Sequence, residues 1–298
     1  MFIFESCNSH IRPIKSPHHE PARLRFSRYG IFMNRTLAMN HPLNDAERGL
    51  REDEFFFLLQ PKFTLQTLAL SGFEYLMRWR HPSRGVLEPS AFISMVEDSR
   101  LAGQFTDLLT QRATRMLAQW AASGHHALSI SINLSPLELG HADFPARLAA
   151  LFDTLDVDPH RLEIELTDVV PPARLDWLVE AIHAVQAIGV RVALDDFGAG
   201  FNALTLLQQL PVDIVKFDRS LLRDVAQNDE AMRVLETLVH LAKVHRKQTV
   251  VTGIETAEQF EWARGLAGIE AQGFYLGAPL CLTEVDAFIA GHAPNPGG

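Results

Sequence analysis

The sequence predicts an α/β protein, a single (β/α)8 barrel with a flexible N-terminal extension. Eight short apolar or β-branched runs, each of strand length, recur along the 298-residue chain. Segments with the helical spacing of apolar residues lie between most of these runs, as expected where strands and helices alternate. Polar side chains end nearly every run, and in a barrel the carboxyl ends of the strands meet at one mouth.

The expected strands follow one another from residue 55 to residue 276. They are Phe55–Gln60, Phe73–Trp79, Leu128–Leu134, Leu162–Leu166, Val190–Leu194, Ile214–Phe217, Thr249–Ile254 and Gly273–Leu276. An open doubly wound sheet is the alternative, but such a sheet would bind its ligand at one switch point. Because polar residues end nearly every strand here, we favour a closed parallel barrel.

Four helices have clear local signals. Apolar residues at helical spacing predict helices over residues 105–120, 175–185 and 232–242. Gly124 and Gly189 follow the first two at positions where glycine commonly ends a helix. Thr256 and Gln259 have the spacing of a capping box, which predicts the start of a fourth helix.

The two ends of the chain differ from the rest. Residues 1–44 mix His, Pro, Arg and Asn without sustained apolar periodicity, and we expect them to form the flexible extension. The barrel domain is expected over residues 45–293. Residues 294–298 are rich in Pro and Gly, and we expect a disordered tail.

Composition excludes several classes of protein. Hydrophobic residues make up 47% of the chain and charged residues 21%, as in ordinary globular proteins. The formal charge of −9 argues against nucleic acid as a partner, since that would require a basic surface. With only Cys7 and Cys281, no disulfide framework is expected, and no apolar run is long enough to span a membrane. We therefore expect a cytoplasmic protein.

Acidic side chains and one amide stand at the ends of separate strands. They are Glu74, Asn133, Glu165, Asp195 and Asp196. All are hard oxygen donors, which suit Mg²⁺, Mn²⁺ or Ca²⁺ rather than zinc. Two such ions about 3.5–4 Å apart would activate a water and stabilise the phosphorus centre during phosphodiester cleavage.

Taken singly, each acid could be a solvated loop residue or a helix N-cap. The run Asp195-Asp196-Phe197-Gly198 is harder to explain in that way, because adjacent carboxylates after an apolar run are costly unless a cation or hydrogen-bond donors compensate. Asp-Phe-Gly also occurs in protein kinases, but the chain lacks their glycine-rich loop, strand lysine motif and His-Arg-Asp loop. We therefore favour the metal site.

Over about residues 54–287 the chain resembles the EAL domains, which are phosphodiesterases and receptors for the bacterial messenger cyclic di-GMP. The blocks that carry the resemblance are Glu74-Tyr75-Leu76, Arg78-Trp79-Arg80-His81-Pro82, Pro89-Ser90-Ala91-Phe92-Ile93, Asn133-Leu134-Ser135, Glu165-Leu166-Thr167-Asp168, Asp195-Asp196-Phe197-Gly198, Lys216-Phe217-Asp218-Arg219-Ser220 and Gln272-Gly273-Phe274. The resemblance implies a TIM-like barrel of the EAL type.

The resemblance also implies roles for individual residues. Those that match metal ligands are Glu74, Asn133, Glu165, Asp195 and Asp196. Lys216 matches a lysine beside the metals and the attacking water, and Gln272 matches a glutamine that orders the site. Positions that match ligand contacts are Gln60, Leu76, Arg78, Asp218 and Pro279, the last two near a guanine. The implied cofactor is Mg²⁺ or Mn²⁺, with Ca²⁺ inhibitory or structural.

The chain departs from the family at its catalytic acid. Where the family has Glu-Gly-Val-Glu-Thr, this chain has Thr252-Gly253-Ile254-Glu255-Thr256. Thr252 cannot act as a base near neutral pH, and its hydroxyl is a poorer Mg²⁺ ligand than a carboxylate. Hydrolysis is therefore expected to be weak or absent, unless a neighbouring acid such as Glu255 compensates.

Three further positions differ from the family pattern. The loop Ala199-Gly200-Phe201-Asn202-Ala203 lacks the hydroxyls of the family's Thr-Gly-Tyr-Ser-Ser, and in the family this loop links the metal site to the dimer interface. Asp168 replaces a longer Glu that anchors the loop. Tyr75 replaces a small residue, but because strand side chains alternate it should point away from Glu74 and Leu76.

Three functions follow from these matches and departures. We favour a degenerate domain that binds cyclic di-GMP and passes its level to an unknown protein effector in motility, adhesion or biofilm control. The alternatives are an active metal-dependent phosphodiesterase that produces pGpG, and a protein-interaction module that no longer binds nucleotide. The retained Arg78, Asn133, Asp218 and Gln272 argue against the last. A homodimer is a further expectation from the family.

Overall fold

The structure is a computed structural model that describes residues 35–166, 174–198, 203–223, 225 and 228–292, with the side chains of 35–41 and 203 left out. Its strands are β1 (Phe55–Thr64), β2 (Ala69–His81), β3 (Gly85–Leu87), β4 (Ser129–Asn133), β5 (Leu162–Leu166), β6 (Arg191–Phe197), β7 (Ile214–Phe217), β8 (Gln248–Thr252), β9 (Glu270–Gln272) and β10 (Leu280–Cys281). Its α-helices are α1 (Arg35–Arg51), α2 (Ile93–Glu97), α3 (Ala102–Ala122), α4 (Pro136–Leu139), α5 (Phe144–Leu155), α6 (Leu175–Gln186), α7 (Ala203–Gln209), α8 (Asp229–Val244), α9 (Ala257–Arg264) and α10 (Leu282–Gly291).

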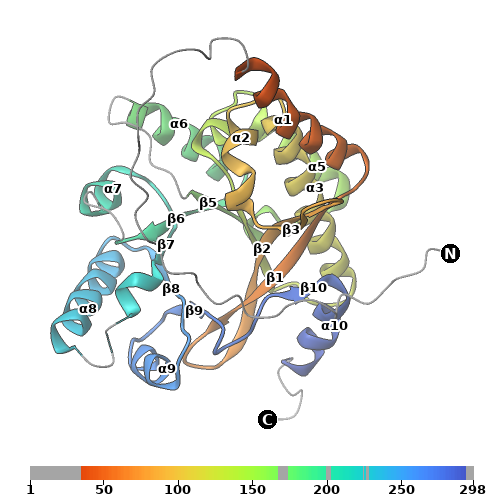
Figure 1. The fold of residues 1–298 in the computed structure, drawn as a ribbon. Helices are drawn as coiled ribbons and strands as arrows, with labels where there is room; N and C mark the ends of the chain where they lie inside the picture. The colour runs from red at the N-terminus through yellow and green to blue at the C-terminus, as the bar shows by residue number, and fades with distance from the viewer. Residues whose placement is uncertain (1–34, 167–173, 199–202, 224, 226–227, 293–298) are drawn as a thin grey trace, which may run out of the picture.

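The strands close into the predicted barrel. Its order is β1-β9-β8-β7-β6-β5-β4-β2, and β2 pairs with β1 to complete the ring, which the helices surround (Figure 1). β2 and β4 to β9 are parallel, but β1 runs antiparallel to both of its neighbours in the ring, so the expected all-parallel barrel was wrong at this strand. Only residues 65–68 join β1 to β2, and a parallel crossover needs a dozen residues or more.

The last expected strand was misplaced, and the one before it was expected to end at Ile254 but ends at Thr252. The last parallel strand is Glu270–Gln272, whereas the expected strand at residues 273–276 is a turn in which Gly273 O accepts hydrogen bonds from Leu276 N and Gly277 N, both at 3.0 Å. This turn passes so close to Ile254 that a Cβ on Gly273 would lie 2.2 Å from its carbonyl oxygen. β8 ends at Thr252 because Gly253 adopts a φ of +77°.

The helical predictions are confirmed. α3, α6 and α8 cover the three expected segments, and Gly124 and Gly189 follow α3 and α6 with positive φ. Thr256 and Gln259 form the capping box of α9. The side chains that these helices bury pack on the outer faces of the strands, so the main core is the layer between the barrel and the helices.

The barrel interior is polar toward the amino ends of its strands. Lys62 Nζ on β1 lies 2.5 Å from Glu163 Oε2 on β5, and both side chains are buried. Arg191 on β6 pairs with the other oxygen of Glu163. Glu163 and Glu165 lie two residues apart on β5, so this ion cluster is the layer directly beneath Glu165.

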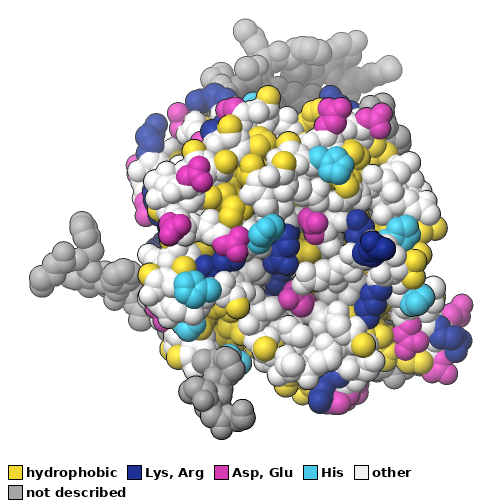
Figure 2. All heavy atoms as spheres, turned by 180° about the vertical axis from the view of Figure 1, so that it is seen from behind, with side chains coloured by type: hydrophobic (Ala, Val, Ile, Leu, Met, Phe, Trp, Pro, Cys, Tyr) yellow, Lys and Arg dark blue, Asp and Glu magenta, His cyan; other side chains and the backbone are white. Residues whose placement is uncertain are grey.

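The outer surface mixes charges of both signs. On the face opposite to that of Figure 1, acidic, basic and histidine side chains are interspersed with small hydrophobic groups (Figure 2). Among the described residues, no helix has the length and apolar content needed to cross a membrane. Helix α1 begins at Arg35, within the segment expected to be the extension, and residues 1–34 and 293–298 lie outside the described part.

Candidate active site

A pocket of about 210 Å³ lies at the ends of the barrel strands. Its lining residues are Gln60, Glu74, Asp195, Asp196, Lys216, Asp218, Arg219, Thr252, Gly253, Glu255, Gln272, Gly273 and Phe274. We call it the acidic pocket. Most of the site residues expected from the sequence line it, and Asn133 and Glu165 contact its lining through Glu74 and Lys216. Strands far apart in the sequence therefore deliver one site.

The ammonium group of Lys216 lies at the centre of the acids. Its Nζ is 2.6 Å from Glu165 Oε2, 3.2 Å from Glu74 Oε2 and 3.7 Å from Asp195 Oδ2. Burial alone would lower the pKa of Lys216, but the three carboxylates outweigh it and raise the pKa well above its ordinary value. Lys216 is therefore a fixed internal cation.

One cation cannot compensate several buried carboxylates equally. Burial works to raise the pKa of Glu74, but Lys216 and hydrogen bonds from Gln272 Nε2 at 2.8 Å and Asn133 Nδ2 at 3.1 Å outweigh it and lower the pKa. Burial and the neighbouring carboxylates instead raise the pKa of Glu165 to about 8, despite Lys216. The two glutamates therefore shift in opposite directions, with the pKa of Glu74 lowered and that of Glu165 raised.

Asp195 and Asp196 both line the pocket although they are consecutive in a strand, where side chains normally alternate. The pairing of β6 with β7 shifts register between Leu194 and Phe197, and Asp196 has a φ of +49°. This β-bulge turns both carboxylates toward one pocket. Burial, together with Asp195 and Asp218, raises the pKa of Asp196 to about 6.

The hydroxyl of Thr252 is already engaged. Its Oγ1 donates a hydrogen bond to the carbonyl oxygen of Phe217 at 2.9 Å. Gly253 follows so close to Arg219 that a Cβ there would lie 2.3 Å from the Arg219 Cβ. Glu255 also lines the pocket, but it is exposed, and its backbone N–H donates to Gln259 Oε1. Position 252 therefore supplies a neutral group bound to the neighbouring strand.

The oxygen ligands of this site are of the types that bind a divalent metal. Glu165 Oε2 contacts the ammonium group of Lys216, while among the described residues its Oε1 is buried without a hydrogen-bond partner, and such an oxygen suits a cation. Among the described residues, however, no three acidic, histidine or cysteine side chains converge as metal ligands would. In this arrangement Lys216 supplies the positive charge between the acids.

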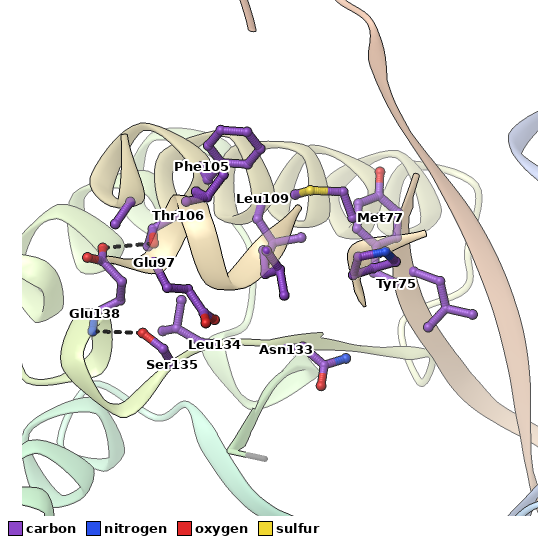
Figure 3. A pocket seen from close by; sticks show the side chains of 15 residues that line it. Tyr75, Met77, Glu97, Phe105, Thr106, Leu109, Asn133, Leu134, Ser135 and Glu138 are labelled. Carbon is purple, nitrogen blue, oxygen red and sulfur yellow. Dashed lines mark hydrogen bonds between the residues drawn. The ribbon is translucent and has the colours of Figure 1, made fainter. Parts of the chain in front are cut away.

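A second, mostly apolar pocket of about 340 Å³ lies between β2, β4, α2, α3 and α4 (Figure 3). Its lining residues are Tyr75, Leu76, Met77, Pro89, Ile93, Val96, Glu97, Ala102, Phe105, Thr106, Leu109, Asn133, Leu134, Ser135 and Glu138. We call it the apolar pocket. Asn133 lines it and also donates to Glu74, so the two pockets adjoin at this residue.

The remaining predicted residues lie around the two pockets. Leu76 lines the apolar pocket rather than the acidic one. Arg78 lies two residues further along β2, where its Nη1 donates to Met77 O at 2.8 Å. Pro279 lines neither pocket and precedes β10, whose Leu280 pairs with Leu59 next to Gln60. Asp218 Oδ1 accepts from Ser220 N at 2.9 Å.

Tyr75 points away from the acids, as alternation predicts. It is 3% exposed, and its ring stacks on Phe57 at 4.3 Å between the barrel and the helices. Sequence reasoning missed Arg219 and Phe274 in the acidic pocket, although both lie within motifs that it had identified. Asp168 and residues 199–202 lie outside the described part, so the two departures noted there have no structural account.

Comparisons with known proteins agree on one family. The sequence model of the EAL domain matches residues 43–279. An uncharacterised signalling protein of Caulobacter vibrioides is 32% identical over 79% of this chain and 29% of its own length. The cyclic di-GMP phosphodiesterase PA2567 of Pseudomonas aeruginosa is 30% identical over 80% of this chain and 40% of its own length. The chain thus spans less than half the length of these relatives.

Solved structures give the same picture. The match to the EAL enzyme Bd1971, in its cAMP- and cyclic di-GMP-bound form, has a TM-score of 0.77 with 25% sequence identity. It covers 85% of this chain and 69% of the Bd1971 chain. The match to the PaMucR phosphodiesterase, in complex with cyclic di-GMP, has a TM-score of 0.75 with 27% sequence identity. It covers 82% of this chain and 99% of the PaMucR chain.

Proposed function

Because the chain belongs to the EAL domain family, we propose that it binds cyclic di-GMP at the barrel mouth and hydrolyses it slowly or not at all. In this proposal the chain is a cytoplasmic receptor that passes the level of the nucleotide to a protein partner. The fit of the two adjoining pockets to such a ligand supports binding. The chemistry at Thr252 supports the loss of hydrolysis.

The observation that carries the proposal is the hydrogen bond from Thr252 to Phe217. The other groups of the acidic pocket include carboxylates, a lysine and a glutamine. A general base must accept a proton near neutral pH, and a neutral hydroxyl that is already donating cannot do so. Ligand binding depends on the remaining groups and does not require an acid at position 252.

The two pockets divide the ligand between them. Cyclic di-GMP has two phosphodiesters within a ring and two purine bases outside it. The acidic pocket suits a phosphodiester beside Lys216, and Arg78, two residues after Leu76 on β2, is a planar donor for phosphate oxygens. The adjoining apolar pocket suits a purine base, and its volume of about 340 Å³ is within the range of small-molecule sites.

A divalent ion, Mg²⁺ or Mn²⁺, is part of the proposal. The residues that would hold it are Glu74, Asn133, Glu165, Asp195 and Asp196. A bound ion would neutralise the carboxylates and polarise a phosphate oxygen. Among the protein's own groups, Gln272 and Asn133 orient Glu74 through hydrogen bonds to its two oxygens, and Lys216 keeps a positive charge beside the scissile phosphate.

The second candidate is an active phosphodiesterase that opens cyclic di-GMP to pGpG. Glu255 favours it, since this carboxylate lines the acidic pocket three residues after Thr252. In that case Glu255 would accept the proton of the attacking water. Glu255 is exposed, whereas Thr252 is half-buried between the strand ends, so we place this candidate second.

Calorimetry and a product assay separate these functions. We expect cyclic di-GMP to bind with 1:1 stoichiometry per chain, and pGpG to form slowly or not at all with Mg²⁺ or Mn²⁺. Rapid metal-dependent formation of pGpG, abolished by Glu255→Gln, would establish the second candidate instead. If cyclic di-GMP did not bind with or without metal, both would be excluded.

A further inference from the structure

Glu138 lies in a sequence that should form a capping box but forms only half of it. Ser135 is the N-cap of α4, and its Oγ accepts a hydrogen bond from Glu138 N at 3.3 Å. The Glu138 side chain does not return to the backbone of Ser135, as a complete box requires. Its Oε2 instead accepts from Thr106 Oγ1 on α3 at 2.9 Å (Figure 3). The carboxylate is thereby held at the wall of the apolar pocket.

The surroundings of this carboxylate do not neutralise it. Glu138 is 8% exposed, and the described lining of the apolar pocket contains no Lys, Arg or His. Within the described residues Glu138 forms no ion pair, and its carboxylate accepts a hydrogen bond from the neutral hydroxyl of Thr106. A buried carboxylate with so little compensation is costly unless a bound ligand supplies further donors.

Resting on the proposed function, we propose that Glu138 reads the base in the apolar pocket and selects guanine over adenine. The Watson–Crick edge of guanine carries two adjacent donors, N1–H and the 2-amino group. A carboxylate is an acceptor with two oxygens and can take both hydrogen bonds side by side. The pocket walls of Leu109, Phe105 and Met77 would pack against the faces of the ring.

Adenine presents the opposite pattern at one of the two positions. Its N1 is an acceptor, which would face a carboxylate oxygen without a proton between them, and its 6-amino group supplies one donor. Two acceptors that face each other in a buried pocket repel, so binding of adenine beside the Glu138 carboxylate carries a strong penalty. The repulsion against adenine therefore contributes to selection as much as the hydrogen bonds to guanine do.

An isosteric substitution reverses the complementarity. In Glu138→Gln the amide oxygen can still accept from Thr106 or from a base, while the amide nitrogen becomes a donor. A glutamine amide pairs with the donor and acceptor of adenine rather than with the two donors of guanine. Glu236→Gln, at an exposed position of α8, is the matched control that makes the same chemical change outside both pockets.

The test is the affinity of the full chain for cyclic di-GMP, cyclic di-IMP and cyclic di-AMP, measured by calorimetry. Hypoxanthine keeps N1–H and lacks the 2-amino group, so the wild-type protein should bind in the order cyclic di-GMP, cyclic di-IMP, cyclic di-AMP. Glu138→Gln should reduce the preference for cyclic di-GMP over cyclic di-AMP by about 10- to 100-fold. The Glu236→Gln control should leave the preference unchanged, and circular dichroism should show both variants folded.

The outcomes separate this inference from the proposed function. If the wild-type protein binds cyclic di-GMP and Glu138→Gln retains the wild-type ratio of affinities, Glu138 does not select the base, although the proposed function stands. A shift caused by Glu97→Gln and not by Glu138→Gln would assign the selection to Glu97 and overturn the inference. Absence of cyclic di-GMP binding to the wild-type protein would overturn both.

Discussion

Replacing Thr252 by glutamate tests the chemical reason for lost hydrolysis. The substitution removes the hydrogen bond to Phe217 O, at a cost of about 1 kcal/mol in the free energy of unfolding. It also adds a half-buried carboxylate to a pocket that already contains Glu74 and Asp195, where Lys216 is the central cation, at a further cost of about 1–3 kcal/mol. With a chelator present, Thr252→Glu should therefore be less stable than the wild type by about 2–4 kcal/mol. The matched variant Thr252→Gln loses the same hydrogen bond without the charge and should lose about 1 kcal/mol.

Urea unfolding in EDTA and in Mg²⁺ measures these differences, and an assay for pGpG measures turnover. Mg²⁺ should recover most of the gap between the glutamate and glutamine variants, because a cation compensates the added charge. With Mg²⁺, Thr252→Glu should form pGpG about 10²–10⁴ times faster than the wild type. If it forms pGpG no faster than Thr252→Gln, the missing acid at position 252 does not limit hydrolysis, and the reasoning fails.

Three further predictions concern the same pocket. Lys216→Met leaves Glu165, Glu74 and Asp195 without their shared cation, so in EDTA it should destabilise the protein by about 3–5 kcal/mol, and an unchanged urea midpoint would contradict the central role of Lys216. The pKa of Glu165 is raised from 4.5 to about 8, so the folded state keeps a proton that the unfolded state has released, and in EDTA stability should fall as pH rises through this window. Glu165→Gln should flatten that fall, and an equally steep decline in the variant would refute the assignment. Arg78→Ala should weaken cyclic di-GMP binding by about 10- to 100-fold and Arg78→Lys by less, whereas equal losses would argue against a two-pronged phosphate contact.

The sequence predicted most of the barrel because strand and helix signals in this chain are local. Apolar runs of strand length, glycines after helices and one capping box are each visible within a few residues. The orientation of β1 was missed because it depends on the turn at residues 65–68, which carries no Asn-Gly or Asp-Gly signal. The last strand was misplaced because the apolar residues at 274–276 belong to an exposed turn at the pocket rim, where Phe274 is 63% exposed.

The acidic pocket was predictable because strand ends in a barrel converge whatever the details of packing. Two other features of the site were not predictable. The bulge that turns both Asp195 and Asp196 inward depends on the register between β6 and β7. The apolar pocket is built from α2, α3, α4 and two strands, so no local pattern announces it. Glu138 had only a capping-box spacing, and the contact with Thr106 that diverts its side chain is tertiary.

The central claim is that this EAL domain retains cyclic di-GMP without hydrolysing it. The most direct measurement is the identity of the nucleotide recovered from the purified chain after incubation with cyclic di-GMP and Mg²⁺ and removal of the unbound ligand. The account predicts intact cyclic di-GMP bound to the protein, with pGpG near the level of a protein-free control. Recovery of pGpG as the main product, or of no nucleotide on the protein, would contradict it.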